Sequence, residues 1–317
     1  MIDCSFLPVF YEHHQCKKAG TTPPDFSDYT AMENIWLSFY GLGKFEIFQF
    51  IYAQCNSFTH LQQWMIALKG EENIRQSAAA FEKWAAQRTM QVTIENPTTA
   101  ILNEDQRHHW RQQGYIKISG LVPEQLCDDV CQVICTHLGA DYNNPQTWYN
   151  THAEWHGLML QLYQHESINA IRALPLIQQV FTELYGTPNL VANTEKVSFN
   201  PPETDTWKFS HHKLHWDIDF TKPDRNYIQG LVYLNDVPEN RGPFKLVPGF
   251  NHQFEDWMKT YPDPIEAQQE MQKKLTGTPV TGKKGDIILW LQTLPHAASA
   301  NHSNLPRFVQ YISFSRW

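Results

Sequence analysis

The segment Lys213–Phe220, KLHWDIDF, holds a histidine and an aspartate two residues apart, at His215 and Asp217. On a β-strand, residues i and i+2 point to the same face, so both side chains can reach one point. An imidazole nitrogen and a carboxylate oxygen suit a divalent transition metal. In a chain with 15 histidines such a pair also arises by chance, and a structural salt bridge explains the pair alone equally well.

Two later residues favour the metal interpretation. His296 follows the strand-like segment Gly285–Trp290, and two histidines with one carboxylate form the facial triad of non-haem Fe(II) oxygenases. Arg307 lies beyond His296 across the turn-rich stretch NHSNLP, so we expect a hairpin that sets Arg307 beside the metal. A bidentate guanidinium is a suitable partner for the second carboxylate of a metal-bound diacid such as 2-oxoglutarate.

The metal-binding residues belong to a longer pattern. Its other segments are NEDQRHHWRQQGYIKISGLVPEQL (Asn103–Leu126), NPP (Asn200–Pro202), LNDVPENRGPFKLVPGFNH (Leu234–His252), and GDIILW with HAASANHSNLPR within Gly285–Arg307. In this order they resemble the phytanoyl-CoA dioxygenase family of Fe(II)/2-oxoglutarate-dependent oxygenases. The resemblance covers about residues 103–317, and residues 1–100 carry none.

This resemblance implies a double-stranded β-helix, a jelly-roll or cupin-like barrel with Fe(II) at its mouth. It implies that His215, Asp217 and His296 bind the iron and that Arg307 binds the distal carboxylate of 2-oxoglutarate. The implied reaction consumes O2, converts 2-oxoglutarate to succinate and CO2, and hydroxylates a C–H bond. Asp217 argues against a halogenase, in which chloride replaces this carboxylate.

Four further residues are weaker candidates. Lys196 aligns with a position that contacts 2-oxoglutarate in relatives, and Tyr233 is a second candidate for cofactor binding. Asp219 and Gln229 are candidates for contacts with the substrate. Asp219 shares a predicted strand face with His215 and Asp217, and Gln229 shares one with Tyr233 on a second strand, from which either can reach the pocket. The structural alternatives are a solvated lysine, a core tyrosine and an edge glutamine.

The elements that must position these residues change in type along the chain. Helical spacing covers 35–54 and 57–88, and 91–99 reads as a connector. Helices are predicted from Asn103, as N-cap, to Gln113 and over 123–137, with a strand over 115–118 between them. Later strands are predicted over 190–199, 213–220, 227–234, 244–247, 286–290 and 308–314. We expect an α+β protein: a mainly helical region, 1–100, of unknown role, and a dioxygenase domain, 101–317, with supporting helices.

Composition narrows the class of protein. With 42% hydrophobic and 18% charged residues the chain can fill a core, and its net charge of −8 disfavours nucleic acid as a partner. The most apolar stretch, 35–55, is interrupted by glycines and charges, so we expect no membrane span. The six cysteines form no CxxC pair and the first residues lack a basic signal-peptide region, so we expect free thiols and a cytoplasmic protein.

The leading hypothesis is an Fe(II)/2-oxoglutarate-dependent hydroxylase that acts on a small metabolite or a carrier-tethered group. An alternative is a non-catalytic double-stranded β-helix that binds a ligand or partner. It has two reasons: many family members carry a hydroxyl residue two positions after the distal histidine, where this chain has Ala298, and the unassigned residues 1–100 can serve as an interaction module. A third hypothesis is a cupin isomerase or hydrolase that does not use 2-oxoglutarate. The sequence does not indicate the oligomeric state.

Overall fold

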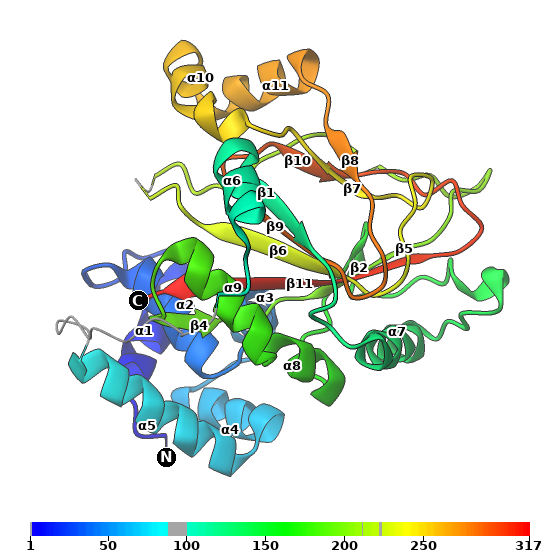
Figure 1. Ribbon diagram of the computed structural model, residues 1–317. Coiled ribbons are helices and arrows are strands. Elements are labelled where there is room, and N and C mark those ends of the chain that lie inside the picture. The colour runs from blue at the N-terminus through cyan, green and yellow to red at the C-terminus, as the bar shows by residue number, and fades with distance from the viewer. Residues whose placement is uncertain (1, 88–99, 211, 222–223) are drawn as a thin grey trace. The chain divides into compact units, whose positions relative to one another are not determined.

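The computed structural model describes residues 2–87, 100–210, 212–221 and 224–317. The chain divides into two compact units, whose elements are labelled in Figure 1. Unit 1 comprises Met1–Pro97, Gly186–Thr194 and Phe314–Trp317, and unit 2 comprises Thr98–Tyr185 and Glu195–Ser313. The predicted connector over 91–99 lies outside the described residues. The assignment of a dioxygenase domain to 101–317 stays a prediction.

Unit 1 is built mainly from helices. They are α1 (Phe6–Lys18), α2 (Tyr29–Phe39), α3 (Lys44–Ala53), α4 (Phe58–Lys69) and α5 (Glu71–Gln87), and the short strand β4 (Leu190–Ala192) pairs with residues 314–316. The two long helical segments predicted from the sequence are each divided. Gly41 and Gly70 adopt positive φ angles of 58° and 82°, which glycine tolerates without strain and which end the preceding helices.

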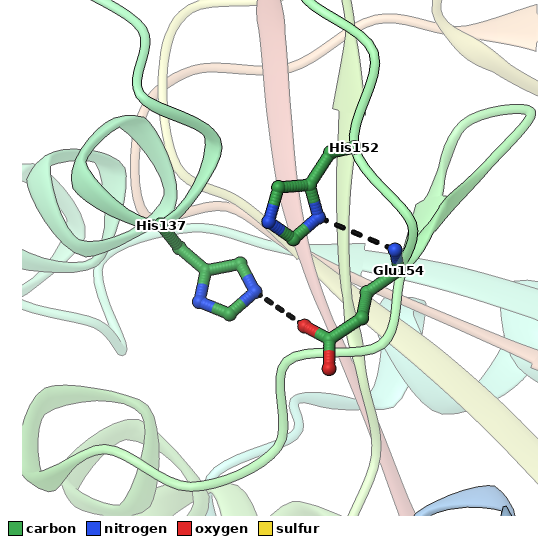
Figure 2. A group of neighbouring side chains, drawn as sticks. All are labelled: His137, His152 and Glu154. Atoms are coloured by element: carbon green, nitrogen blue, oxygen red, sulfur yellow. Dashed lines mark hydrogen bonds and ion pairs between the residues drawn. The ribbon is translucent and has the colours of Figure 1, made fainter.

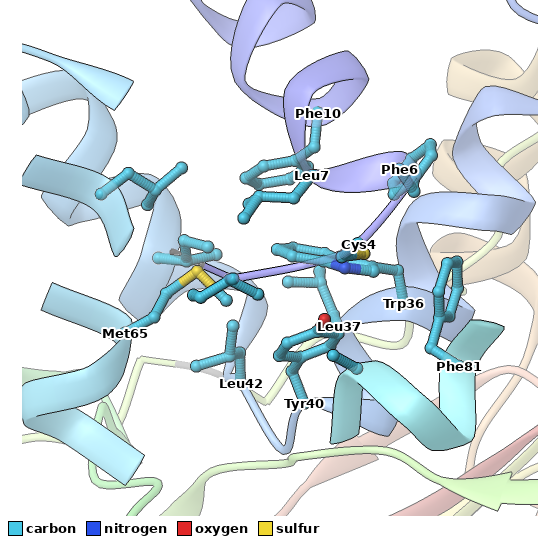
Figure 3. Packing of buried hydrophobic residues seen from close by; sticks show 14 of the residues in the cluster. Cys4, Phe6, Leu7, Phe10, Trp36, Leu37, Tyr40, Leu42, Met65 and Phe81 are labelled. Carbon is cyan, nitrogen blue, oxygen red and sulfur yellow. The ribbon is translucent and has the colours of Figure 1, made fainter. Parts of the chain in front are cut away.

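The core of unit 1 is rich in aromatic side chains, as Figure 3 shows. Trp36 of α2 is fully buried, and its ring centroid lies 4.6 Å from that of Phe10 on α1. Helix α4 contributes Leu61 and Met65, both fully buried, as their helical spacing predicts. Unit 1 therefore has an apolar core of its own.

Helix α2 of unit 1 carries a buried carboxylate. Glu33 of α2 accepts a hydrogen bond from His14 Nε2 at 2.9 Å and lies 3.0 Å from Lys44 Nζ. Burial alone would raise the pKa of Glu33, but the hydrogen bond from His14 and the charge of Lys44 outweigh it and lower that pKa to about 2. Ionised Glu33 therefore stabilises the folded state.

We expect Glu33→Gln to lower the free energy of unfolding by about 3 kcal/mol at pH 7. The folded-state pKa lies below the ordinary value of 4.5, so this contribution is present above pH 4.5 and is lost as pH falls toward 2. Urea unfolding between pH 2 and 7 should show a flatter acid limb for the variant. Glu72→Gln, in an exposed ion pair on α5, is the control. Parallel acid limbs for wild type and Glu33→Gln would contradict this account.

The described residues of unit 2 form two antiparallel sheets. The larger has the order β1-β9-β6-β11-β5-β3-β2, and the smaller has the order β10-β7-β8. Their bounds are β1 (Tyr115–Ile118), β2 (Trp155–His156), β3 (Met159–Leu160), β5 (Val197–Asn200), β6 (Ile228–Tyr233), β7 (Phe244–Leu246), β8 (Thr278–Val280), β9 (Ile287–Leu291), β10 (His296–Ala298) and β11 (Arg307–Arg316). Strand β11 continues from unit 2 into unit 1.

The two sheets share one hydrophobic core. Leu231 of β6 and Ile288 of β9 come from the larger sheet, and Leu246 of β7 comes from the smaller one. Phe254 and Met271 extend this core into α10 (Phe254–Thr260) and α11 (Pro264–Lys274). The arrangement is a two-sheet sandwich whose inner faces carry the apolar residues of each strand.

Further helices of unit 2 precede or connect the strands. They are α6 (Glu104–Gln113), α7 (Glu124–Leu138), α8 (Glu166–Arg172), α9 (Pro175–Tyr185) and two 3-10 turns, Pro145–Thr147 and Phe250–His252. The predicted start of α6 is confirmed, because Asn103 and Gln106 form a reciprocal capping box. Gly114, with a φ of 71°, ends this helix as predicted.

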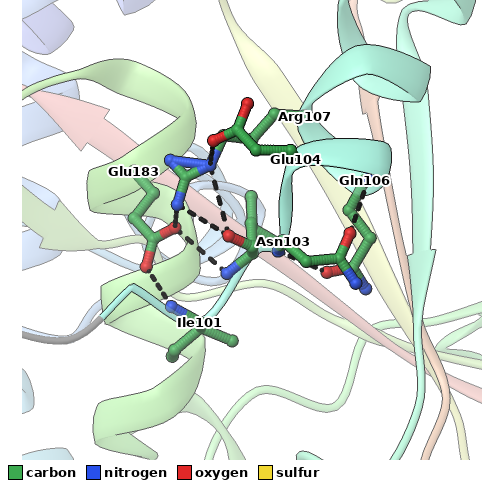
Figure 4. A network of polar contacts seen from close by, with 7 residues as sticks. Ile101, Asn103, Glu104, Gln106, Arg107 and Glu183 are labelled. Carbon is green, nitrogen blue, oxygen red and sulfur yellow. Dashed lines mark hydrogen bonds and ion pairs between the residues drawn. The ribbon is translucent and has the colours of Figure 1, made fainter.

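Figure 4 shows how the segment before α6 is held to α9. The Glu183 carboxylate of α9 accepts hydrogen bonds from the backbone N–H groups of Ile101 and Leu102, at 2.6 and 3.2 Å. Arg107 of α6 donates to the same carboxylate at 3.2 Å. These contacts position the chain that enters β1, the edge strand of the larger sheet.

Two predicted strands are wrong. Over 213–220 only His215 pairs, in a bridge with His296. The alternation that suggested a strand is present as burial, since Leu214 and Trp216 are buried, but it does not produce a hydrogen-bonded ladder. The segment 190–199 contains two strands, β4 and β5. The Asn193 side chain between them accepts bonds from Ser38 and Ser315.

Helix α7 carries three of the cysteines that are expected to be free thiols. Cys127, Cys131 and Cys135 are free, and burial raises the pKa of Cys127 to about 12 and that of Cys135 to about 11. These thiols are therefore packing residues and weak nucleophiles. None of the helices in the described part of the chain combines the length and apolarity that a membrane crossing requires.

Candidate metal centre

His215, Asp217 and His296 converge, although His296 lies far from the other two in the sequence. One ligand atom from each residue lies within 4.8 Å of the others. His296 Nε2 is 3.3 Å from Asp217 Oδ2, and His215 Nε2 is 3.9 Å from Asp217 Oδ1. Backbone hydrogen bonds of 3.0 Å in both directions join His215 and His296, so their side chains stand on the same face, with ring centroids 4.6 Å apart.

The hydrogen bonds of the two rings orient both Nε2 atoms toward a candidate cation site. The Nδ1 atom of His215 lies 3.1 Å from the carbonyl oxygen of Lys213, and that of His296 lies 3.0 Å from the carbonyl oxygen of Leu294. A carbonyl only accepts, so each Nδ1 donates there and each Nε2 is directed at Asp217, where it offers a lone pair to a metal ion or, when protonated, a hydrogen bond to the carboxylate. Two lone pairs and a carboxylate then face one point. A divalent metal ion or a proton must lie between them, and this His/Asp/His donor set suits Fe(II).

Asp217 lies on a loop, and its side chain is 57% exposed, whereas His296 is buried. Partial burial raises the pKa of Asp217, but the hydrogen bond that a protonated His296 donates and the charges of protonated His296 and His215 outweigh it and hold that pKa well below its usual range. Gln229 also donates to Asp217 Oδ2, at 2.9 Å. The carboxylate is thus ionised and oriented.

A cavity of about 190 Å³ opens beside the three residues and is lined also by Arg307. Arg307 is only 1% exposed. Its Nη1 donates to the carbonyl of Gly242 at 2.5 Å, and its Nη2 lies 3.4 Å from Ser198 Oγ. Its Nε has no hydrogen-bond partner, and no ion pair to it is found among the described residues. A buried guanidinium with spare donors at a cavity wall suits an anionic ligand.

Arg307 does not reach this position by the predicted hairpin, which is wrong. Strand β10, with His296, pairs with β7 in the smaller sheet, whereas β11, with Arg307, pairs with β5 and β6 in the larger one. The turn between them therefore connects the two sheets. His296 and Arg307 meet across the cavity because the sheets face each other.

The weaker sequence candidates separate into two groups. Lys196 and Gln229 line the cavity. Tyr233 does not line the cavity, because it is fully buried in the core. Its hydroxyl donates to the Val280 carbonyl at 2.7 Å and accepts from the Phe244 N–H at 2.9 Å. Asp219 does not line the cavity either. Its carboxylate accepts hydrogen bonds from the N–H and hydroxyl of Thr221.

Sequence reasoning missed several wall residues. Tyr311 and Ser313 lie on the same face of β11 as Arg307 and line the cavity, which their even spacing from Arg307 could have indicated. Trp290 of β9 and Phe244 of β7 line it too, and their ring centroids are 4.3 Å apart. The alternation along the strand therefore indicates Tyr311 and Ser313, whereas no sequence pattern indicates Trp290 and Phe244.

A second group of possible ligands, His137, His152 and Glu154, is shown in Figure 2. His137 lies in the last turn of α7, and its Nε2 is 2.6 Å from the Glu154 carboxylate. The Nδ1 of His152 accepts from the Glu154 backbone N–H at 3.3 Å. These contacts satisfy the three residues as an ion pair and a turn, so we assign them a structural role.

Comparison with known proteins decides the family. The family model for phytanoyl-CoA dioxygenase matches residues 110–309. The chain belongs to the phytanoyl-CoA dioxygenase family. A Dictyostelium discoideum protein named for the same family is 22% identical, over 64% of this chain and 72% of the relative. A 2-aminoethylphosphonate dioxygenase from the uncultured bacterium HF130_AEPn_1 is 23% identical, over 68% of this chain and 83% of that protein.

Solved structures show the same fold. EctD from S. alaskensis with bound Fe has a TM-score of 0.52 and 18% identity, over 71% of this chain and 80% of that chain. The predicted fold class, an α+β protein with a double-stranded β-helix, is confirmed. Members of this family are oxygenases that depend on Fe(II), 2-oxoglutarate and O2. The chain is therefore an Fe(II)/2-oxoglutarate-dependent oxygenase.

Gly242, whose carbonyl holds Arg307, adopts a φ of 62°. A Cβ there would lie 2.7 Å from Asn200 Nδ2 and 2.8 Å from the Ser299 carbonyl oxygen. Gly139 has the same φ and open space around it, so Gly139→Ala is a matched control. We expect Gly139→Ala to cost about 1 kcal/mol and Gly242→Ala clearly more, measured by urea unfolding. Equal losses would show that the packing around Gly242 is not as tight as described.

Proposed function

We propose that the protein is a hydroxylase that inserts a hydroxyl group into a C–H bond of a small molecule, with release of succinate and CO2. One observation carries the proposal: three lone-pair donors, His215, Asp217 and His296, converge beside a cavity with the buried Arg307 in its wall. We propose these three residues as the Fe(II) ligands. A facial triad leaves three positions open for co-substrate and O2.

Each residue has a distinct task in this proposal. The two imidazoles keep their lone pairs directed at the metal site because backbone carbonyls hold their Nδ1 protons. Arg307, which lines the cavity, binds the distal carboxylate of 2-oxoglutarate and thereby orients the diacid. When bound, Fe(II) with 2-oxoglutarate supplies the activation of O2 for C–H oxidation. The apolar wall, with Leu158 and Phe244, excludes water from the reacting carbon.

Lys196 remains our candidate for a second contact with 2-oxoglutarate or with the substrate, because it lines the cavity. Tyr233 is no longer a candidate, because its hydroxyl is engaged in the core. The cavity volume of about 190 Å³ favours a small substrate or the end of a carrier-tethered group. Free cysteines agree with a reducing compartment, so we place the reaction in the cytoplasm.

We favour hydroxylation, although proteins with this fold also carry other reaction names. The structure of SnoK, named as a carbocyclase from nogalamycin biosynthesis, has a TM-score of 0.52 and 17% identity over 70% of this chain and 88% of that chain. The bacterial relative is named as a 2-aminoethylphosphonate dioxygenase, so small polar molecules belong in the first substrate set. The alternative of a non-catalytic binding protein rests on Ala298 and on the unassigned region 1–100.

We expect the protein, purified without oxygen and supplied with Fe(II), 2-oxoglutarate and ascorbate, to form succinate after O2 is admitted. Asp217→Ala should abolish both iron retention and succinate formation. Arg307→Leu should retain iron but raise the KM for 2-oxoglutarate by about 10- to 100-fold, since it removes charge-assisted hydrogen bonds.

Arg111→Leu, on the exposed side of α6, is the control and should leave both properties unchanged. Mass spectrometry of a small-molecule panel for a gain of one oxygen atom identifies the substrate. Succinate formation that survives in Asp217→Ala, or an unchanged KM in Arg307→Leu, would refute the assigned roles.

A further inference from the structure

Gln229 and Trp290 form a cross-strand pair behind the metal site. They are register partners in β6 and β9, two neighbouring strands of the larger sheet. Trp290 Nε1 donates to Gln229 Oε1 at 3.0 Å, and Gln229 Nε2 donates to Asp217 Oδ2 at 2.9 Å. A continuous chain of hydrogen bonds therefore runs from a sheet to a carboxylate on a loop.

The chemistry of the indole fixes the direction of this chain. An indole N–H only donates, so it must face the carbonyl oxygen of the Gln229 amide. The NH2 group of that amide is then turned toward Asp217, where a carboxylate only accepts. Rotation of the amide by 180° would break both bonds and set an oxygen against the carboxylate. Trp290 thus determines that Gln229 acts as a donor.

Trp290 also contacts a second metal-binding candidate. It is 2% exposed, and its ring centroid lies 5.3 Å from that of His296. Phe244 packs against both rings, with centroid distances of 4.3 and 5.8 Å. The indole is therefore held rigidly, and one side chain supports His296 by packing and Asp217 through Gln229.

Asp217 requires such support more than the two histidines do. His215 and His296 are joined by backbone hydrogen bonds, whereas Asp217 lies on a loop and is 57% exposed. Within the described residues, the hydrogen bonds to its carboxylate come from His296 and Gln229. A metal ion would replace the contact with His296, which leaves Gln229 as the contact that orients the carboxylate from outside.

We propose that Gln229 and Trp290 are positioning residues, which hold the Asp217 carboxylate in the orientation that binds the metal. The proposal rests on the proposed function, because it takes Asp217 as a ligand. It also reassigns Gln229 from a substrate contact to a support of the metal site. A neutral amide suits this task, because it donates to the carboxylate without adding a charge that opposes the metal.

The test is the affinity for Co(II) alone, a redox-stable substitute for Fe(II), measured by calorimetry on the full chain. Gln229→Met keeps the length of the side chain but removes the donor, and we expect about 10- to 100-fold weaker binding. Trp290→Phe keeps the aromatic packing but removes the N–H, and we expect about 2- to 10-fold weaker binding.

The double variant separates positioning from independent effects. If Trp290 acts through Gln229, then Gln229→Met with Trp290→Phe should bind Co(II) no more weakly than Gln229→Met alone. Gln292→Met is the matched control, because the Gln292 amide donates to the Asp224 carbonyl and does not line the cavity. It should leave Co(II) affinity unchanged. Circular dichroism and melting temperature verify that each variant is folded.

The outcomes distinguish this proposal from the proposed function. If the wild-type protein binds Co(II) no better than His215→Ala does, the metal site itself is wrong. If the wild-type protein binds one Co(II) and folded Gln229→Met binds it equally well, the positioning role is wrong and the metal site stands. Additive losses in the double variant would likewise overturn the coupling of Trp290 to Gln229.

Discussion

Two backbone hydrogen bonds between His215 and His296 are the constraint on which the site depends. They join segments that are distant in sequence and bring both imidazoles to one face. The loop that carries Asp217 then has only two residues to travel before its carboxylate meets both rings. Every other feature of the site refines this junction: carbonyls fix the ring protons, and the opposing sheet contributes Arg307 and Gln229.

The division of tasks between the two sheets follows from this constraint. The smaller sheet, extended by the His215 bridge, carries the two histidines. The larger sheet carries the proposed partners of a bound diacid and of the Asp217 carboxylate, on β6, β9 and β11. A sandwich with aligned inner faces can therefore assemble a metal site and a co-substrate site from strands that are not neighbours. Among the described residues, both groups of possible metal ligands belong to unit 2.

The sequence allowed the prediction of the residue types and of their grouping, but not of their connections. The spacing of His215 and Asp217 was informative because burial alternates there, even though a strand ladder does not form. The pairing of His215 with His296 could not be predicted, because long-range register leaves no local pattern. For the same reason the predicted hairpin between His296 and Arg307 is wrong: the sequence does not show which strands pair. Tyr233 and Gln229 lie on the same face of β6, so the sequence pattern does not distinguish them. Their hydrogen bonds do: Tyr233 bonds within the core, and Gln229 bonds to Asp217.

The most direct measurement of the central claim is the visible absorption of the protein under anaerobic conditions as Fe(II) and then 2-oxoglutarate are added. The account predicts one iron bound per chain and a charge-transfer band that grows only when the keto acid is added. It also predicts that replacement of His215 or His296 by alanine removes the band. No bound iron, or a band that persists without these histidines, would contradict the convergence of the three residues on a single ion.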